Sequence, residues 1–321
     1  MKRILITGAL GQIGTELTAY LRKQYGKDNV IASSRRKRGD ESFFETGPFE
    51  ILDVNDAQGI ADICKKYKIN QIIHLAAILS AKAEENPQQA YNINMNGTYN
   101  VLEVAREAGI AVFTPSSIAA FGAGTPADNT PQDTIQRPNT MYGVTKVAGE
   151  LLCDYYYLKY GVDTRGVRFP GIISYETLPG GGTTDYAVHI FYEALKNKKY
   201  SCFIKAGTFM DMMYMPDALK AIHDLMEANP EKLKHRNAFN VTAMSFEPEM
   251  LAAEIRKHIP EFEMSYDVDP VRQSIADSWP NSLDDSCARE EWGWCPKYDL
   301  SSMTADMLQK LAEKLKIRSE E

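Results

Sequence analysis

The sequence predicts an α/β fold in which a doubly wound parallel sheet is joined to a smaller C-terminal lobe. Across the first half of the chain, short apolar segments of strand character alternate with helical segments of about ten to twenty residues. This alternation is typical of a parallel sheet that carries helices on both faces. At 321 residues the chain is also long for a single hydrophobic core, which favours one large unit and a smaller lobe.

The expected elements follow from hydrophobic periodicity, taken in chain order. In the first half, strands are expected at 4–7, 29–34, 49–54, 71–77, 110–114 and 163–169, and helices at 12–25, 56–67, 87–108 and 141–160. After Pro170 the pattern is irregular, with a loop over 178–186 and a helix over 186–196. A strand at 237–241 is expected to return to the sheet. A last helix at 302–317 carries an apolar stripe that indicates packing: Met303, Met307, Leu311 and Leu315.

Three glycines at spacing three, Gly8, Gly11 and Gly14, follow the first strand. Glycine suits a sharp strand-to-helix turn because it tolerates positive φ and close backbone approach. The first helical residues, Gln12 and Ile13, then lie where backbone amides and the positive end of the helix dipole favour a phosphate. The motif predicts a Rossmann-type site for a dinucleotide pyrophosphate, although a glycine triplet alone also fits a plain tight turn.

The predicted domains follow from this motif. Residues 1–170 form the dinucleotide-binding unit, with about 205–242 returning to it. Residues 171–204 and 243–321 form the substrate-binding lobe. In open sheets of this kind, ligands bind at the carboxyl ends of the strands, where most polar residues of interest are found.

Bulk properties exclude several classes of function. The net charge of −7 offers no general attraction to nucleic acid or to an anionic membrane. The chain has no run of about eighteen apolar residues, and no secretory signal follows Met1, so the cytoplasm is the expected location. Five scattered cysteines suit a reducing compartment. The five histidines show no metal-ligand spacing, so no metal is expected; His74 belongs in the core.

The end of the second strand bears on the choice of cofactor. A carboxylate there typically binds the adenosine ribose of NAD, whereas an arginine accommodates the 2′-phosphate of NADP. This chain has Ser34, Arg35 and Arg36 and no carboxylate before Asp40, a pattern that suits NADP. The alternative is that the arginines lie in a solvated loop. Asp53, near the end of the third strand, is a candidate contact to the adenine.

The candidate reacting groups lie at the start of the helix 141–160. Tyr142 and Lys146 are four residues apart and therefore share one helix face. A nearby ammonium is expected to lower the pKa of a tyrosine by about one to three units, so that tyrosinate takes a proton from a substrate hydroxyl as hydride leaves the same carbon. Ser117, after the fifth strand, is placed to hydrogen-bond the reacting oxygen; in isolation it would more often cap a turn.

These motifs together resemble the extended short-chain dehydrogenases/reductases. The second half of the chain narrows the resemblance to the short-chain L-threonine 3-dehydrogenases, on segments 168–174, 178–187, 212–215 and 276–280. The resemblance implies oxidation of the threonine side-chain alcohol to 2-amino-3-oxobutanoate, with Tyr142 as the base. It implies NAD as the cofactor, although that family carries an acidic residue where this chain has Ser34.

The resemblance also assigns the remaining site residues. Contacts to the cofactor are implied for Val54, Leu75, Ala76, Ala77, Asn94 and Pro170, together with Tyr142 and Lys146, the latter on the nicotinamide ribose. Contacts to the substrate are implied for Ser80, Ser117, Tyr142, Gly182, Thr184, Asp185 and Trp279. Of these, the Asp185 carboxylate suits the ammonium group of an amino acid, whereas a structural role is an alternative for Ser80 and Trp279.

Two other functions remain as alternatives. A nucleotide-sugar epimerase, dehydratase or reductase on the same scaffold would need a larger pocket with basic residues for a diphosphate, whereas the loop before Asp185 offers an acid. A non-catalytic cofactor sensor should lack the Tyr142 and Lys146 pair. The resemblance further implies a homodimer through the helices 87–108 and 141–160, and a ligase that consumes 2-amino-3-oxobutanoate as a possible downstream partner.

Overall fold

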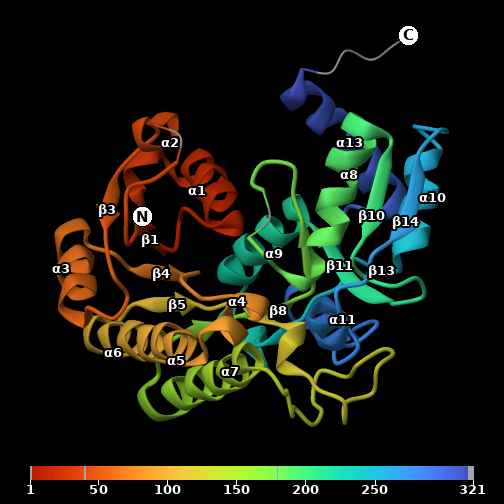
Figure 1. Cartoon of the computed structure of the whole chain (residues 1–321). Coiled ribbons are helices and arrows are strands. Elements are labelled where there is room, and N and C mark those ends of the chain that lie inside the picture. Colours follow the sequence, from red (N-terminus) through yellow and green to blue (C-terminus); the bar gives the residue numbers. More distant parts are fainter. Residues whose placement is uncertain (1, 40, 179, 317–321) are drawn as a thin grey trace.

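The protein is described by a computed structural model that covers residues 2–39, 41–178 and 180–316. Its central sheet has six parallel strands in the order β3-β2-β1-β4-β5-β7. These strands are β1 (Ile4–Thr7), β2 (Val30–Ser34), β3 (Phe49–Ile51), β4 (Gln71–His74), β5 (Ala111–Phe113) and β7 (Thr164–Arg165). The predicted parallel sheet is therefore confirmed, and Figure 1 shows it in the red-to-yellow half of the chain.

Two of the chain segments in this sheet continue beyond it. After β5 and β7 the same segments form β6 (Ser116–Ser117) and β8 (Val167–Phe169), which pair in parallel. The strand β12 (Phe239–Asn240) pairs in parallel with β8. A strand near 237–241 thus forms as predicted, but it joins the small sheet β12-β8-β6 and not the six-stranded central sheet. The predicted strand 163–169 is divided at Gly166, where a Cβ atom would lie 2.3 Å from the carbonyl oxygen of Thr114.

Helices cover both faces of the sheet because alternate residues of β1 point to opposite sides. Ile4 and Ile6 pack with residues of α1 (Gln12–Tyr25) and α9 (Met215–Glu227). Leu5 packs on the other face with residues of α3 (Ala57–Tyr67), α6 (Gly97–Ala108) and α7 (Met141–Tyr160). This is the doubly wound arrangement that the sequence predicts.

The ends of α7 show why this helix forms where the periodicity predicts it. The Thr140 hydroxyl accepts a hydrogen bond from the Gly143 amide, which caps the N-terminus. The helix ends at Gly161, whose φ of +71° is a left-handed conformation that glycine adopts without strain. The predicted helix 87–108, by contrast, is three pieces: α5 (Pro87–Tyr91), a π-helical turn at Asn92–Asn96, and α6.

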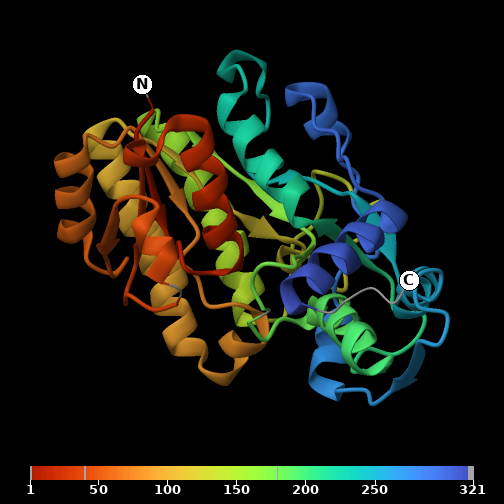
Figure 2. The same cartoon turned by 90° about the horizontal axis from the view of Figure 1, so that it is seen from above.

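A second core lies in the C-terminal part, where the sequence offered little pattern. Its helices are α8 (Tyr186–Asn197), α10 (Pro248–Arg256) and α13 (Leu300–Leu315). They pack against two small sheets made of β9 (Gly171–Ile173), β11 (Met210–Tyr214) and β13 (Met244–Phe246), and of β10 (Lys199–Cys202) and β14 (Glu263–Tyr266). Figure 2 shows the blue C-terminal part beside the red-to-yellow N-terminal part. The stripe on α13 packs as predicted: Met303, Met307 and Leu311 are fully buried.

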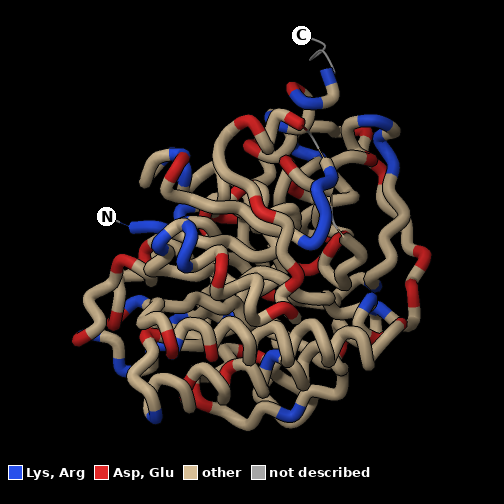
Figure 3. Tube along the Cα trace, turned by 90° about the vertical axis from the view of Figure 1, so that its left-hand side faces the viewer, with Lys and Arg blue, Asp and Glu red and all other residues tan. Residues whose placement is uncertain are grey.

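The remaining helices are short. They are α2 (Glu41–Glu45), α4 (Ser80–Glu85), α11 (Pro270–Ala276) and α12 (Ser286–Trp292). The predicted end of the last helix, at Ile317, lies outside the described residues. In the described chain, no helix combines the length and the apolar character that crossing a bilayer requires. Figure 3 shows acidic and basic residues interspersed along the chain trace.

Candidate active site

The glycine turn between β1 and α1 has the geometry that its sequence predicts. Gly8 has φ +68°, and a Cβ atom there would lie 2.7 Å from the backbone nitrogen of Ala76. A Cβ on Gly14 would lie 2.4 Å from the carbonyl oxygen of Gly8, so only glycine lets α1 pack this closely on the turn. Gly11 is the N-cap residue and provides no side-chain cap, so the first amides of α1 stay free for a ligand.

A cavity at the carboxyl ends of the strands joins this turn to the C-terminal lobe. It is lined by sixteen of the predicted site residues: Gly8, Gly11, Gln12, Ile13, Gly14, Leu75, Ala77, Ser80, Ser117, Tyr142, Lys146, Pro170, Gly182, Thr184, Asp185 and Trp279. The fold therefore brings together the phosphate-binding turn, the candidate reacting groups and the candidate substrate loop. The Gln12 side-chain nitrogen is buried there without a hydrogen-bond partner in the part of the chain that the structure describes. This unpartnered donor and the glycine cradle fit a bound dinucleotide.

The candidate reacting groups lie together at the start of α7. The Ser117 hydroxyl is hydrogen-bonded to Tyr142 and also accepts a hydrogen bond from the Ala119 amide at 3.2 Å. Ser117 thus caps a turn and also contacts Tyr142, while its hydrogen bond to a reacting substrate oxygen stays a prediction. The Lys146 ammonium donates to the carbonyl oxygen of Pro115 at 2.6 Å and lies 5.3 Å from the centre of the Tyr142 ring.

The predicted lowering of the Tyr142 pKa is not what this structure gives. Burial raises the pKa of Tyr142 to about 12, and the hydrogen bond from Ser117 opposes this only in part. Burial also lowers the pKa of Lys146 to about 8, while the negative charge of Glu150 opposes that change. The prediction was wrong for this state because both groups are deeply buried, and desolvation disfavours the charged form of each.

The candidate substrate end is formed by the turn that precedes α8. One carboxylate oxygen of Asp185, Oδ2, accepts hydrogen bonds from the Gly181 and Gly182 amides at 2.9 and 2.6 Å. Burial raises the pKa of Asp185, and these backbone hydrogen bonds oppose the rise. The second carboxylate oxygen has no hydrogen bond within the described residues. Asp185 therefore holds the glycine loop with one oxygen and leaves the other for a cation.

The other predicted substrate contacts surround the same space. Ser80 is buried at the start of α4, and Trp279 packs beside the hydrophobic cluster that includes Tyr142. Thr184 packs so closely on Gly171 that a Cβ there would lie 2.7 Å from its methyl group. Thr183, which was not among the predicted site residues, also lines the cavity, and its hydroxyl is buried without a hydrogen-bond partner among the described residues. The Thr-Thr pair marked the segment, but the sequence pattern could not show which hydroxyl faces the cavity.

The predicted adenosine contacts lie outside this cavity. Ser34 ends β2, next to β1, and Arg35 and Arg36 are exposed and form no ion pair within the described residues. The Asp53 carboxylate accepts a hydrogen bond from the Asn55 amide at 2.9 Å, which gives it a turn-forming role. Val54 is buried against Gly97, where a Cβ would lie 2.7 Å from its methyl group. Their contacts to a cofactor stay predictions.

Asn94, predicted to contact the cofactor, uses its side chain within the protein. Its oxygen accepts from the Ile78 amide at 2.8 Å, and its nitrogen donates to the Ile78 carbonyl at 3.0 Å and to the Thr145 hydroxyl at 3.1 Å. Asn94 therefore ties the loop after β4 to α7 and fixes Tyr142 and Lys146 indirectly. It lies in the π-helical turn, a local irregularity that often marks functional sites.

Two histidines have structural partners. His74 shares a hydrogen bond with the Thr7 hydroxyl at 2.8 Å, and burial lowers the pKa of His74 to about 3, so it is a neutral core residue as predicted. His235, Cys287 and Glu291 come within 4.8 Å of one another, which their spacing in the sequence does not indicate. Glu291, however, already accepts from His235 and from the Lys234 and His235 amides. This carboxylate thus acts as an internal cap.

The comparisons with known proteins agree with this geometry. A sequence model of the NAD dependent epimerase/dehydratase family matches residues 4–242. An uncharacterized epimerase/dehydratase of Staphylococcus saprophyticus is 58% identical over 98% of this chain and 99% of its own length.

Solved structures give a sharper likeness. L-threonine dehydrogenase from Clostridium difficile is 66% identical, with a TM-score of 0.96 over 98% of each chain. The enzyme from Phytophthora infestans is 50% identical, with a TM-score of 0.94 over 98% of this chain and 100% of that one. A UDP-glucose 4-epimerase from Thermotoga maritima has a TM-score of 0.84 at 21% identity, which shows a shared fold only. The chain therefore belongs to the NAD dependent epimerase/dehydratase family, on the branch that holds these L-threonine dehydrogenases.

Proposed function

We propose that this protein is an L-threonine 3-dehydrogenase, which oxidises the side-chain alcohol of L-threonine to 2-amino-3-oxobutanoate. The observation that carries the proposal is one cavity that joins the glycine turn, Tyr142 with Ser117 and Lys146, and the buried Asp185 carboxylate. The high identity to L-threonine dehydrogenases over nearly the whole chain supports it independently. A nucleotide sugar would need basic residues for its diphosphate, whereas the loop before α8 offers Asp185.

The reaction requires a base for the substrate hydroxyl and an acceptor for the hydride. A bound nicotinamide ring supplies the hydride acceptor. Tyr142 takes the hydroxyl proton of threonine onto its phenolate oxygen, and Ser117 holds the same substrate oxygen by a hydrogen bond. Lys146 orients the nicotinamide ribose, and its positive charge favours the ionised form of Tyr142. In the resting site this effect has to overcome the burial that raises the pKa of Tyr142 to about 12.

The substrate is held by its charged groups and by the walls of the cavity. Asp185 pairs with the ammonium group of threonine through the carboxylate oxygen that the glycine loop leaves free. Ser80, Thr183 and Thr184 offer hydroxyl groups around the amino acid, and Trp279 closes the wall next to Tyr142. These roles are part of the proposal. We also propose that the chain has two domains with different ligands. The cofactor is bound by residues 1–170 and 205–242, and the substrate by residues 171–204 and 243–321.

For the cofactor we propose NAD, with NADP accepted as well. The glycine turn, Gln12 and Ile13 bind the pyrophosphate, and Asp53 contacts the adenine. At the end of β2 no carboxylate repels a 2′-phosphate, and Arg35 and Arg36 are exposed cations near that point. A 2′-phosphate is therefore tolerated there.

Exposed apolar side chains on α5, α6 and α7 support a homodimer, which is also part of the proposal. On α7, Leu151, Tyr155 and Leu158 are 62%, 51% and 81% exposed, and Tyr99 on the neighbouring α6 is 49% exposed. Apolar side chains thus lie on the solvent face of α7 as well as on its core face, which favours a partner surface. The product, a β-keto acid, needs a following step, and a 2-amino-3-oxobutanoate ligase is the proposed downstream partner.

The test is the initial rate of nicotinamide reduction with L-threonine, measured in parallel with NAD and NADP. Turnover with L-threonine and not with D-threonine is the expected result, with NAD the better cofactor. UDP-glucose is the control substrate for the alternative chemistry. Conversion of UDP-glucose together with no reduction by L-threonine would overturn the proposed function.

A further inference from the structure

Three side chains at four-residue spacing on α7 face the segment that carries Ser117. Tyr142 contacts the Ser117 hydroxyl, and Lys146 donates to the Pro115 carbonyl oxygen. One turn further on, the Glu150 carboxylate accepts a hydrogen bond from the Ser116 hydroxyl. Every residue of 115–117 is therefore held by a successive turn of the same helix. The first two contacts belong to the proposed reaction, whereas the contact of Glu150 with Ser116 has no role in it so far; only the charge of Glu150, which opposes the lowering of the Lys146 pKa, has been described.

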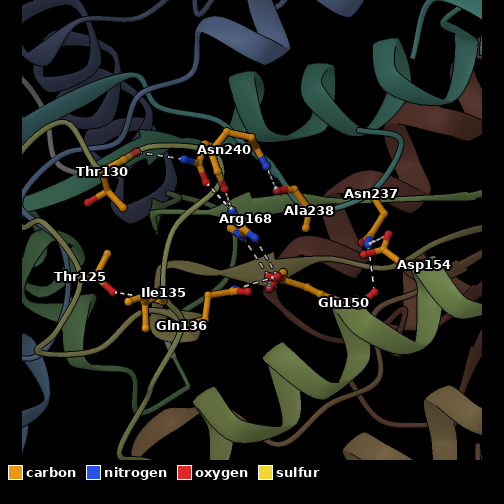
Figure 4. A network of polar contacts seen from close by, with 12 residues as sticks. Thr125, Thr130, Ile135, Gln136, Glu150, Asp154, Arg168, Asn237, Ala238 and Asn240 are labelled. Atoms are coloured by element: carbon orange, nitrogen blue, oxygen red, sulfur yellow. Dashed lines mark hydrogen bonds and ion pairs between the residues drawn. The ribbon is translucent and has the colours of Figure 1, made fainter. Parts of the chain in front are cut away.

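Glu150 is fixed in place by more than Ser116. Arg168 on β8 binds its two carboxylate oxygens through Nε and Nη2, at 3.0 and 2.9 Å, and the Gln136 side chain donates to Oε2 at 2.8 Å. Glu150 and Arg168 are only 5% and 6% exposed. Figure 4 shows Glu150 rising from α7 to meet Arg168 from the strand above it. The carboxylate thus has four donors and no freedom to rotate.

Arg168 is in turn anchored from two further segments. Its Nη1 donates to the Gln132 carbonyl oxygen at 2.8 Å and to the Asn240 side-chain oxygen at 3.1 Å. In the pairing of β6 with β8, Ser116 stands opposite Arg168 and Ser117 opposite Phe169. The Glu150 carboxylate therefore bridges two residues that face each other across the sheet, immediately next to Ser117.

A buried ion pair of this kind is weak evidence for stability, because desolvation of the charges offsets much of their attraction. The ion pair between Glu150 and Arg168 has a specific geometric consequence. Together with Ser116, it holds strand β6 in place, and Ser117 at the end of β6 contacts Tyr142. We propose that Glu150 is a positioning residue for the reaction, acting through Ser116 to hold the Ser117 hydroxyl against Tyr142. This inference rests on the proposed function, since it deepens the role of the same site.

Reaction rates depend steeply on the placement of reacting groups, and a displacement of about 1 Å can cost about a hundredfold. Glu150→Gln keeps the size of the side chain but removes its charge and one of its acceptor oxygens. We expect kcat for L-threonine to fall about tenfold or more, while the KM for L-threonine and the affinity for the cofactor change less than about threefold, because neither ligand touches Glu150. A merely structural role would lower the melting temperature but leave kcat per cofactor-binding site unchanged.

The chain offers matched controls. Asp154, one turn further along α7, accepts from the Asn237 side chain at 2.8 Å and does not face 115–117, so Asp154→Asn should keep kcat within about twofold of the unaltered protein. Ser116→Ala removes the hydrogen bond to Glu150 without disturbing the ion pair, and should reproduce part of the loss in kcat. Ser116→Thr keeps a hydroxyl at this position and should restore the rate. Full kcat in both Glu150→Gln and Ser116→Ala would overturn the proposal.

Amide hydrogen exchange gives a readout that does not depend on the substrate. In Glu150→Gln, peptides covering 115–121 should exchange faster than in the unaltered protein, with little change elsewhere; Asp154→Asn should leave them unchanged. Exchange that is unchanged at 115–121, or that rises equally throughout the chain, would contradict the positioning role even if the Glu150 variant is too unstable for kinetics. If the unaltered protein does not oxidise threonine, the proposed function is overturned. The exchange experiment would still show whether Glu150 holds residues 115–121 in place, so the two failures can be told apart.

Discussion

Tyr142 combines deep burial with a hydrogen bond to Ser117, and both affect when it can act as a base. Burial raises the pKa of Tyr142 to about 12, so an increase in pH favours the ionised form that accepts a proton. The rate of threonine oxidation should therefore rise with pH as Tyr142 ionises, and level off where Lys146, whose pKa burial lowers to about 8, loses the charge that favours this ionisation. We expect Tyr142→Phe to lower kcat by about 10²- to 10⁴-fold and to abolish this rise, since general-base catalysis typically contributes that much. Rates across a pH series measure both effects.

The control for Tyr142→Phe is cofactor affinity, measured by quenching of protein fluorescence with the reduced cofactor. It should remain close to that of the unaltered protein because the phenol oxygen, which this change removes, lies at the reacting end. A variant that keeps its rate within a few-fold of the unaltered protein would exclude Tyr142 as the base.

Asp185 provides the negative charge proposed to hold the substrate ammonium group. Asparagine at this position can still accept from the Gly181 and Gly182 amides, so Asp185→Asn removes the charge and spares the loop. A hydrogen bond to a charged group is worth about 1.5–3 kcal/mol, so we expect the KM for L-threonine to rise by about ten- to a hundredfold, with a smaller change in kcat.

Burial raises the pKa of Asp185, so the KM of the unaltered protein should also rise as the pH falls and the carboxylate gains a proton.

3-Hydroxybutyrate, which lacks the ammonium group, is the matched substrate for this prediction. Its KM should not respond to Asp185→Asn. An equal loss for both substrates would assign Asp185 to the structure of the glycine loop rather than to recognition of the substrate.

For single residues, the residue types and their spacing predicted which side chains lie together, but they did not predict the pKa values of those side chains. Tyr142, Lys146 and Ser117 line one cavity as expected, since a four-residue helical spacing and the end of a strand fix their positions. The pKa of Tyr142 was mispredicted because it depends on burial, which no local pattern reports. Asn94 shows the same limit: its type suggested a ligand contact, whereas its amide joins Ile78 and Thr145.

Elements with strong end signals were predicted well. Both α1 and α7 have the predicted bounds because glycines or a capping threonine mark their ends. Beyond Pro170, strands of two to five residues are too short to show periodicity, and their pairing depends on segments far away in the chain. The order β13-β11-β9, for example, joins residues 171–173 to residues 244–246 across β11. The chain after Pro170 therefore has regular strands and helices, although its sequence shows no clear periodicity.

The end of β2 sets the expected choice between cofactors. Ser34→Asp places a carboxylate beside the predicted position of the adenosine ribose, where it would repel a 2′-phosphate and accept hydrogen bonds from the ribose hydroxyls of NAD. We expect the ratio of kcat/KM for NAD to that for NADP to rise by about tenfold or more, a difference of about 1.4 kcal/mol. Ser34→Ala serves as the control because it alters the same side chain without adding a charge. An unchanged ratio in Ser34→Asp would show that this strand end does not face the cofactor.

At the scale of the whole molecule, one cavity has the glycine turn between β1 and α1 on one side and Asp185 on the other. Helix α7 links this cavity to the outer surface: its core face carries the proposed reacting groups Tyr142 and Lys146 as well as Glu150, and its solvent face carries apolar side chains. In a homodimer through this face, the same patch of both copies would meet about a two-fold axis. Assembly and catalysis would then share one helix.

Leu158 is the most exposed large apolar side chain on that face, at 81%. If α7 pairs with its copy, Leu158→Asp buries a carboxylate in an apolar interface, which costs several kcal/mol and should dissociate the dimer. We expect the unaltered protein to sediment as a dimer and Leu158→Asp to sediment near the chain mass of 36.0 kDa. Ile135→Asp is the matched control, because Ile135 is 63% exposed but lies outside α5, α6 and α7. A dimer that survives Leu158→Asp would argue against this face as the interface, since burial of two unpaired carboxylates in an apolar contact is costly.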